Sequence, residues 1–157
     1  MSEAKGTGGP SRSKASSRVA RDLTAEEVDG VIADNFVAIL ATVADGQPYA
    51  VPFIYGYEDG VFYGVLSPGR KVRNIEQNPS VCVTIVQTED TAKRWRSVVA
   101  TGRASWVEGV LRLGHALNTI RRQYPGNPVR SAPGLAALKG FHMLRVDVDA
   151  LTGRGTY

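Results

Sequence analysis

The residues best suited to chemistry lie together at Ser67–Lys71, between a strand-like run and an amphipathic segment that ends at Asn78–Pro79. The first turn of a helix carries free N–H groups and the positive end of its dipole, and Gly69 lets a ligand come close to the backbone. Arg70 and Lys71 add two full charges. This pattern predicts a binding site for a phosphate monoester.

The same charges also fit an ordinary surface helix. In that interpretation Arg70, Lys71 and Arg73 form its solvated face, and Glu76 is an ion-pair partner. The helix dipole stabilises an exposed anion by only about 0.3–1 kcal/mol, so the two side chains must supply most of any attraction. From these residues alone, the two interpretations carry equal weight.

Length and composition indicate one folded domain in the cytoplasm. The chain of 157 residues is long enough for a single core, and it has no apolar run that spans a bilayer and no apolar segment of a signal peptide. The single cysteine, Cys82, excludes an internal disulfide and lies in an apolar run that predicts a buried thiol. With only His115 and His142 beside it, a dedicated zinc site is not expected.

The net charge of +4 lies at the N-terminus, because residues 1–21 hold five basic residues and one acidic residue. The remaining residues are balanced. Residues 1–18 are also rich in Ser and Gly, and this composition predicts a disordered basic tail. The tail could attract nucleic acid weakly, but a solubilising extension without a partner is the simpler interpretation. No membrane partner is expected.

Local signals predict a mainly β protein with flanking helices. Thr24 and Glu27 have the capping-box spacing for a helix that ends near Asp34, and Asp45-Gly46 and Asp59-Gly60 are typical of tight hairpin turns. Two more helices are expected at the basic segment and at residues 110–124, and a long loop at 125–139. In the second of these helices an apolar stripe recurs at helical spacing, formed by Leu113, Leu117, Ile120 and Tyr124. The predicted strands cover residues 36–43, 49–57, 61–66, 81–87, 96–107 and 141–148. Six such strands fit a small antiparallel barrel.

Three motifs in order resemble one known family over the chain from about residue 23 onward. They are ATVADGQPYAVP at 41–52, GRKVRNI at 69–75 followed by NPSVC at 78–82, and SVVATGRA at 97–104. Together they are similar to the pyridoxamine 5'-phosphate oxidase-like flavoproteins, and in particular to the branch that includes nitroimidazole-resistance proteins. The resemblance implies a six-stranded antiparallel split β-barrel over residues 19–157. It also implies a homodimer with FMN in each of two grooves between the subunits.

The same resemblance assigns residues to the cofactor. Arg70 and Lys71 would hold the FMN phosphate, and Ser97 would bind the cofactor from a neighbouring strand. Further along the chain, Arg154 would lie near the cofactor of the dimer partner. The cofactor-binding residues implied in this way are Thr42, Val51, Pro52, Arg70, Lys71, Ser97 and Arg154. The polar edge of the flavin ring would meet strand backbone, and apolar side chains would cover its face.

The resemblance also implies an FMN-dependent oxidoreductase that acts on a small organic molecule and takes electrons from a nicotinamide. Where that branch commonly has a histidine and a serine before Gly-Arg-Lys, this chain has Gly64 and Val65. The change removes the expected proton donor, and a glycine there predicts a wider substrate cavity. No other catalytic residue stands out.

Other members of the same barrel family use a deazaflavin or bind haem, so both are alternative cofactors. His115 or His142 would then be the candidate haem ligand. A protein that holds flavin or haem without turnover is the alternative function.

Overall fold

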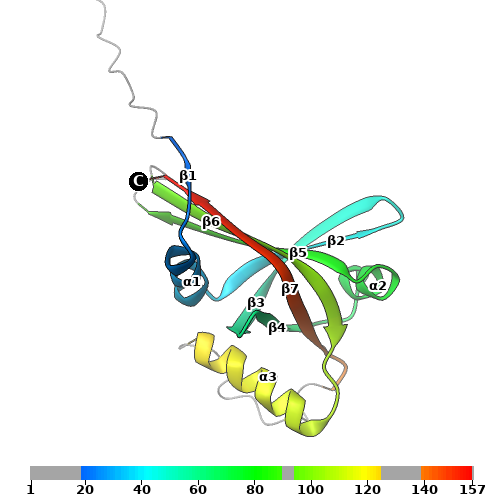
Figure 1. Ribbon diagram of the computed structural model, residues 1–157. Helices are drawn as coiled ribbons and strands as arrows, with labels where there is room; N and C mark the ends of the chain where they lie inside the picture. The colour runs from blue at the N-terminus through cyan, green and yellow to red at the C-terminus, as the bar shows by residue number, and fades with distance from the viewer. Residues whose placement is uncertain (1–18, 90–93, 125–138, 157) are drawn as a thin grey trace, which may run out of the picture.

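The computed structural model describes residues 19–89, 94–124 and 139–156 (Figure 1). The predicted basic tail at 1–18 and almost all of the predicted loop at 125–139 lie outside the described residues. None of the helices in the described ranges combines the length and the apolarity needed to cross a bilayer.

Six long antiparallel strands close into a ring, and a two-residue strand is added to one of them. The strands are β1 (Arg21–Asp22), β2 (Val37–Ala44), β3 (Gln47–Glu58), β4 (Val61–Leu66), β5 (Ser80–Glu89), β6 (Arg94–Trp106) and β7 (His142–Gly155). Their order in the sheet is β1-β7-β4-β3-β2-β5-β6, and β6 pairs with β7 to close the ring. The prediction of a mainly β, six-stranded antiparallel split barrel is confirmed.

Three helices pack around this ring. They are α1 (Ala25–Asp34), α2 (Arg70–Gln77) and α3 (Val110–Gln123). Figure 1 shows α1 near the start of β6 and the end of β7, α2 at the opposite end of the sheet, and α3 across the end formed by β3 and β4. The helices predicted from the sequence are therefore present, each within one or two residues of its expected bounds.

Both predicted hairpin turns have the backbone that their sequences require. The φ angles are 50° at Asp45 and 69° at Gly46, and 48° at Asp59 and 77° at Gly60. Positive φ at both central residues is the signature of the type I′ turn, whose twist matches that of the flanking strands. These turns fix the register of β2 with β3 and of β3 with β4.

Side-chain hydrogen bonds hold both ends of α1 in place. The Thr24 hydroxyl accepts the Glu27 N–H at 3.3 Å, and the Glu27 carboxylate accepts the Thr24 N–H at 2.8 Å, which is the predicted capping box. At the other end, the Gln123 amide of α3 donates to the carbonyls of Ile32 and Asn35, both at 2.7 Å. Gln123 thereby satisfies two carbonyls at the end of α1 and ties this helix to α3.

The ring gives each strand an inner and an outer face. Side chains such as Leu40, Val83 and Val146 fill the inside and are almost fully buried. Apolar side chains also remain exposed on the outside of β2, β3 and β5, with Val86 the most open at 59%. We call this surface the outer apolar face; its residues are Val37, Ile39, Val43, Ile54 and Val86.

Two predictions about the sheet are wrong. The last strand was expected to end at residue 148, but β7 continues to Gly155 because its second half pairs with β6, for example Leu151 with Ala100. Cys82 was expected to be buried, but it is only partly buried. It alternates with the buried Val81 and Val83 and so faces outward, because the apolar run of β5 supplies both faces of the sheet.

Two glycines permit close contacts that no other residue could make. A Cβ at Gly56 of β3 would lie 2.5 Å from the backbone nitrogen of Ile120, so α3 packs directly on the strand backbone. A Cβ at Gly102 would collide with the carbonyl of Asp147, at the bulge where the register of β6 against β7 shifts. Close helix packing and ring closure therefore each depend on a missing side chain.

Gly56→Ala and Gly114→Ala should change stability in opposite directions. At Gly56 the new methyl group meets the α3 backbone, and we expect the free energy of unfolding to fall by about 1–3 kcal/mol. At Gly114, inside α3, a Cβ meets no atom within 4 Å, and we expect a gain of up to about 1 kcal/mol from helix propensity. Urea unfolding of both variants measures the difference, and equal effects would contradict this packing.

Candidate functional site

The N-terminus of α2 presents two cations on an open backbone. The Arg70 guanidinium carbon lies 4.7 Å from the centre of the Tyr49 ring, a cation–π contact that orients the side chain. Lys71 Nζ donates to the Ser67 hydroxyl at 3.0 Å. Gly69, the N-cap residue of α2, has a φ of 149°. The first turn of α2 contains no acidic residue. The predicted anion site therefore combines two cations with the free N–H groups of the first helical turn.

Side-chain hydrogen bonds, one of them buried, hold α2 against β2 and the turn that follows it. Asn74, which is 7% exposed, donates through its side-chain amide to the Thr42 hydroxyl at 3.0 Å. Thr42 in turn donates to the Tyr49 carbonyl at 3.2 Å. A second contact joins the Gln77 amide to the Asp45 carboxylate at 2.6 Å, next to the first hairpin turn. Because α2 is fixed at two points, its N-terminal charges have a defined position.

The predicted residues Thr42, Val51 and Pro52 do not share one face. Thr42 is buried, and its hydroxyl is used in the contact with α2. Val51 pairs with the buried Leu40 and points inward, whereas Pro52 is exposed and points outward. Val51 and Pro52 therefore cannot cover the same face of one ligand with their side chains. The assignment of these three residues to a cofactor stays a prediction.

The other two predicted residues, Ser97 and Arg154, lie far from α2. They are direct partners across β6 and β7. On β5, Val86 pairs with Ser97 and Val81 pairs with Thr42. The strand positions of Ser97 and Thr42 are therefore five residues apart along β5. Five residues of strand span about 17 Å. Figure 1 likewise places α2 and the end of β7 at opposite ends of the sheet, so one protomer does not gather all the predicted site residues.

Arg154 is exposed and makes weak contacts with the start of the domain. Its guanidinium donates to the Ala20 carbonyl at 3.3 Å and lies 3.4 Å from the Asp22 carboxylate. Its side chain is 62% exposed. Such a screened ion pair holds the side chain loosely, so Arg154 remains available to an anion.

Gly64 does not open a cavity. A Cβ at this position would lie 2.6 Å from the Phe53 ring, so Phe53 occupies the space that a larger side chain would take. The prediction of a wider cavity at Gly64 is therefore wrong. Neither Gly64 nor Val65 carries an exchangeable side-chain proton, so these two positions offer no proton donor.

The two histidines already have neighbours. His115 Nε2 lies 2.7 Å from the Glu58 carboxylate, which also accepts a hydrogen bond from Arg122 at 2.8 Å. The His142 ring lies 5.1 Å from the Trp106 ring. Within the described ranges, no group of three or more His, Cys, Asp or Glu side chains is placed to hold a metal ion. The role of either histidine as a haem ligand stays a prediction.

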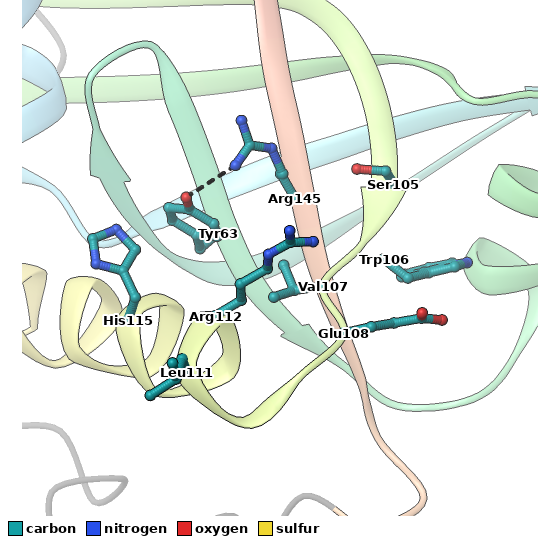
Figure 2. Close-up of a pocket in the computed structure, with 9 residues that line it drawn as sticks. All are labelled: Tyr63, Ser105, Trp106, Val107, Glu108, Leu111, Arg112, His115 and Arg145. Atoms are coloured by element: carbon teal, nitrogen blue, oxygen red, sulfur yellow. Dashed lines mark hydrogen bonds between the residues drawn. The ribbon is translucent and has the colours of Figure 1, made fainter.

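A cavity of about 570 Å³ lies between the start of α3 and strands β4, β6 and β7 (Figure 2). Tyr63, Trp106, Arg112 and Arg145 are among the residues that line it. Arg145 forms two hydrogen bonds with Asp147, at 2.6 and 2.9 Å. This pairing raises the pKa of Arg145 and lowers the pKa of Asp147, so both groups stay charged at neutral pH.

The sequence does not reveal this cavity, because the lining residues come from three distant segments and form no local motif. One weak signal was present in the sequence. The helix 110–123 begins with Val110 and Leu111, two large apolar residues that the predicted apolar stripe of this helix does not include. Both are well exposed in the structure.

Comparison with known proteins matches one protein family over most of the chain. The sequence profile of the family described as pyridoxamine 5'-phosphate oxidase matches residues 24–155. An uncharacterised protein of Rhizobium meliloti is 37% identical over 83 residues, which are 53% of this chain and 54% of that protein. The match therefore spans about half the length of this curated relative.

Solved structures with the same fold include flavin-binding proteins. A FAD-binding protein of Mesorhizobium loti is 29% identical, with a TM-score of 0.71 over 88% of this chain and 99% of its own. A Bacteroides thetaiotaomicron protein, provisionally named a 5-nitroimidazole antibiotic resistance protein, is 22% identical, with a TM-score of 0.77 over 87% of each chain. The FAD and haem-binding protein of Mycobacterium smegmatis is 18% identical, with a TM-score of 0.68 over 85% of this chain and 71% of its own. At these identities the last two share the fold alone.

Thr42→Val should destabilise the protein although it changes the shape of the side chain little. Valine removes the hydroxyl that accepts the Asn74 amide, and an unpaired buried amide costs about 1–3 kcal/mol. We expect the free energy of unfolding to fall by that amount in urea titrations. Thr88→Val, at an exposed position of β5, is the matched control and should have little effect. Equal stability of the two variants would show that Thr42 does not anchor α2.

Proposed function

This chain belongs to the pyridoxamine 5'-phosphate oxidase family, and we propose that it binds a flavin between two copies of itself and uses it to oxidise or reduce a small organic molecule. The observation that carries the proposal is the N-terminus of α2, where Arg70 and Lys71 flank an open backbone. FMN ends in a phosphate monoester, which is the group that this arrangement suits. The FAD-binding relative from Mesorhizobium loti supports a flavin of either kind.

The residues present fit a phosphate. A Cβ at Gly69 would meet no atom within 4 Å, so a ligand can approach the first N–H groups of α2 from that side. Arg70 is exposed, Lys71 is partly buried, and neither pairs with a carboxylate among the described residues. Tyr49, Ser67 and the anchors at Asn74 and Gln77 then hold the charges in place before a ligand binds. A preorganised site loses less entropy on binding.

Two copies are needed because the predicted site residues form two separate groups. Arg70 and Lys71 lie at one end of the sheet, and Ser97 and Arg154 lie at the other. A two-fold axis through the outer apolar face would place one end of one copy against the opposite end of its partner. Such a homodimer would also bury the outer apolar face, whose exposed side chains are otherwise unexplained.

The flavin would supply the redox chemistry when bound, and the chain would bind and orient it. Arg70 and Lys71 would hold the phosphate, and the exposed Pro52 and Val86 would exclude water from the interface between the copies. With Gly64 and Val65 in place of a histidine and a serine, the protein offers no side-chain acid at that point. A nicotinamide is the proposed reductant, and the substrate is proposed to be a small organic molecule that needs no protonation from those positions.

Lys71→Ala should weaken FMN binding by about 10- to 100-fold, because a hydrogen bond to a charged group contributes about 1.5–3 kcal/mol. Titration of the full chain with FMN, followed by flavin fluorescence and by calorimetry, measures the change. Arg73→Ala removes an equal charge from the exposed side of the same helix and should have little effect. If neither FMN nor FAD binds, or if both variants bind as tightly as the original chain, the α2 site is not a flavin site.

Ile39→Glu should convert a dimer into a monomer, because a charge at the centre of the outer apolar face cannot be buried without a partner. Sedimentation velocity of the full chain measures the mass. Val110→Glu is the matched control, since Val110 is exposed on α3, away from this face. A chain that is already monomeric, or an Ile39→Glu variant that stays dimeric, would overturn the proposed interface.

A further inference from the structure

The cavity of Figure 2 contains a buried hydroxyl that has a proton to donate. Tyr63 is 6% exposed, and its hydroxyl accepts a hydrogen bond from Arg145 at 3.4 Å. Among the described residues, no acceptor takes the phenolic proton of Tyr63. Figure 2 shows the hydroxyl pointing away from α3, toward the Arg145 guanidinium. Tyr63 and Arg145 therefore form one polar wall of the cavity, which we call the polar wall, with hydrogen-bond donors that no described residue uses.

The opposite side of the cavity carries a second guanidinium. Arg112, on the first turn of α3, makes no hydrogen bond or ion pair with any described residue. In Figure 2 its side chain extends from the helix toward β7, on the side where Arg145 lies. The carboxylate of Glu108 points away from Tyr63 in the same view. An unpaired guanidinium beside a hydrogen-bonded one favours a planar anion that both can reach.

The lining also has an apolar part, beside the polar residues Ser105, Glu108 and His115. Trp106 and Val107 border the cavity, and Leu111 is 89% exposed at its edge. A volume of about 570 Å³ is within the range that proteins use for small organic ligands. Trp106 and Val107, which are adjacent on the chain, provide a surface for a flat, apolar ligand body.

The balance of charges limits the anion to one negative charge. Asp147 already neutralises Arg145, Glu58 lies 2.7 Å from the lining residue His115, and Glu108 borders the same cavity as Arg112. A phosphate dianion would therefore be poorly compensated, whereas a carboxylate needs only Arg112 and the donors of the polar wall. We propose that this cavity binds a small aromatic monocarboxylate, with its carboxylate on Arg112, Tyr63 and Arg145 and its ring against Trp106 and Val107. This site shares no residue with the proposed flavin site at α2.

Benzoate titration of the full chain tests this proposal, by calorimetry and by the fluorescence of Trp106, one of two tryptophans in the chain. Benzamide has the same shape without the charge, and phenylphosphonate has the same ring with a larger charge. We expect benzoate to bind and both analogues to bind at least about tenfold more weakly. Absence of benzoate binding, or equal or tighter binding of either analogue, would overturn the proposal.

Three variants locate the binding. Arg112→Gln and Tyr63→Phe should each weaken benzoate binding by about tenfold or more, because each removes a hydrogen bond to a charged group. Arg103→Gln is the matched control, since Arg103 is exposed on β6 and does not line the cavity. Full benzoate affinity in Arg112→Gln and Tyr63→Phe would show that benzoate binds elsewhere.

FMN titration of the same variants separates this site from the flavin site. Arg112→Gln should leave FMN affinity unchanged, and Lys71→Ala should leave benzoate affinity unchanged. If Arg112→Gln weakens FMN and benzoate together, the cavity is part of the flavin site and a separate carboxylate site is excluded. If FMN fails to bind while benzoate binds as expected, the proposed function fails and the carboxylate site stands.

Discussion

The pairing of β6 with β7 is the interaction on which the rest of the structure depends. It joins β7 and β6, the first and last of the six long strands in the sheet order, and so closes these strands into a ring with an inner and an outer face. The pairing runs from Arg96 with Gly155 to Trp106 with Leu144 and is interrupted by one bulge at Gly102. Because Gly102 has no side chain, the Asp147 carbonyl can approach it and the two strands can stay paired on both sides of the bulge.

Ring closure also decides where charge and apolar surface lie. The inner face is filled with apolar side chains, so the polar groups that could act on a ligand are placed at the ends of the ring and on the helices. The α2 cations lie at one end, and Ser97 and Arg154 lie at the other. The cavity under α3 uses the middle of β4, the end of β6 and the start of β7. The apolar surface that the inside cannot hold remains on the outside of β2, β3 and β5. The proposed dimer follows from this distribution.

Local signals predicted most of the fold. The two Asp-Gly turns, the capping box at Thr24 and the apolar stripe of the third helix depend on neighbours within a few residues, and each was confirmed. The end of β7 and the exposure of Cys82 were predicted wrongly, because both depend on which distant strand lies alongside. The same limit applies to the candidate sites. Arg70 and Lys71 are adjacent in the sequence and could be found, whereas Tyr63, Arg112 and Arg145 meet only in the folded chain.

The central claim is that one flavin site takes residues from two copies of the chain, and subunit mixing tests it most directly. Lys71→Ala and Arg154→Ala homodimers should each bind FMN weakly, because every site lacks one cation. After the two variants are mixed and allowed to exchange subunits, we expect about a quarter of the sites to regain full affinity, since half of the dimers are mixed and each mixed dimer has one intact site. If mixing restores no tight FMN binding although mixed dimers form, Lys71 and Arg154 do not act on one flavin from opposite subunits, and the account is contradicted.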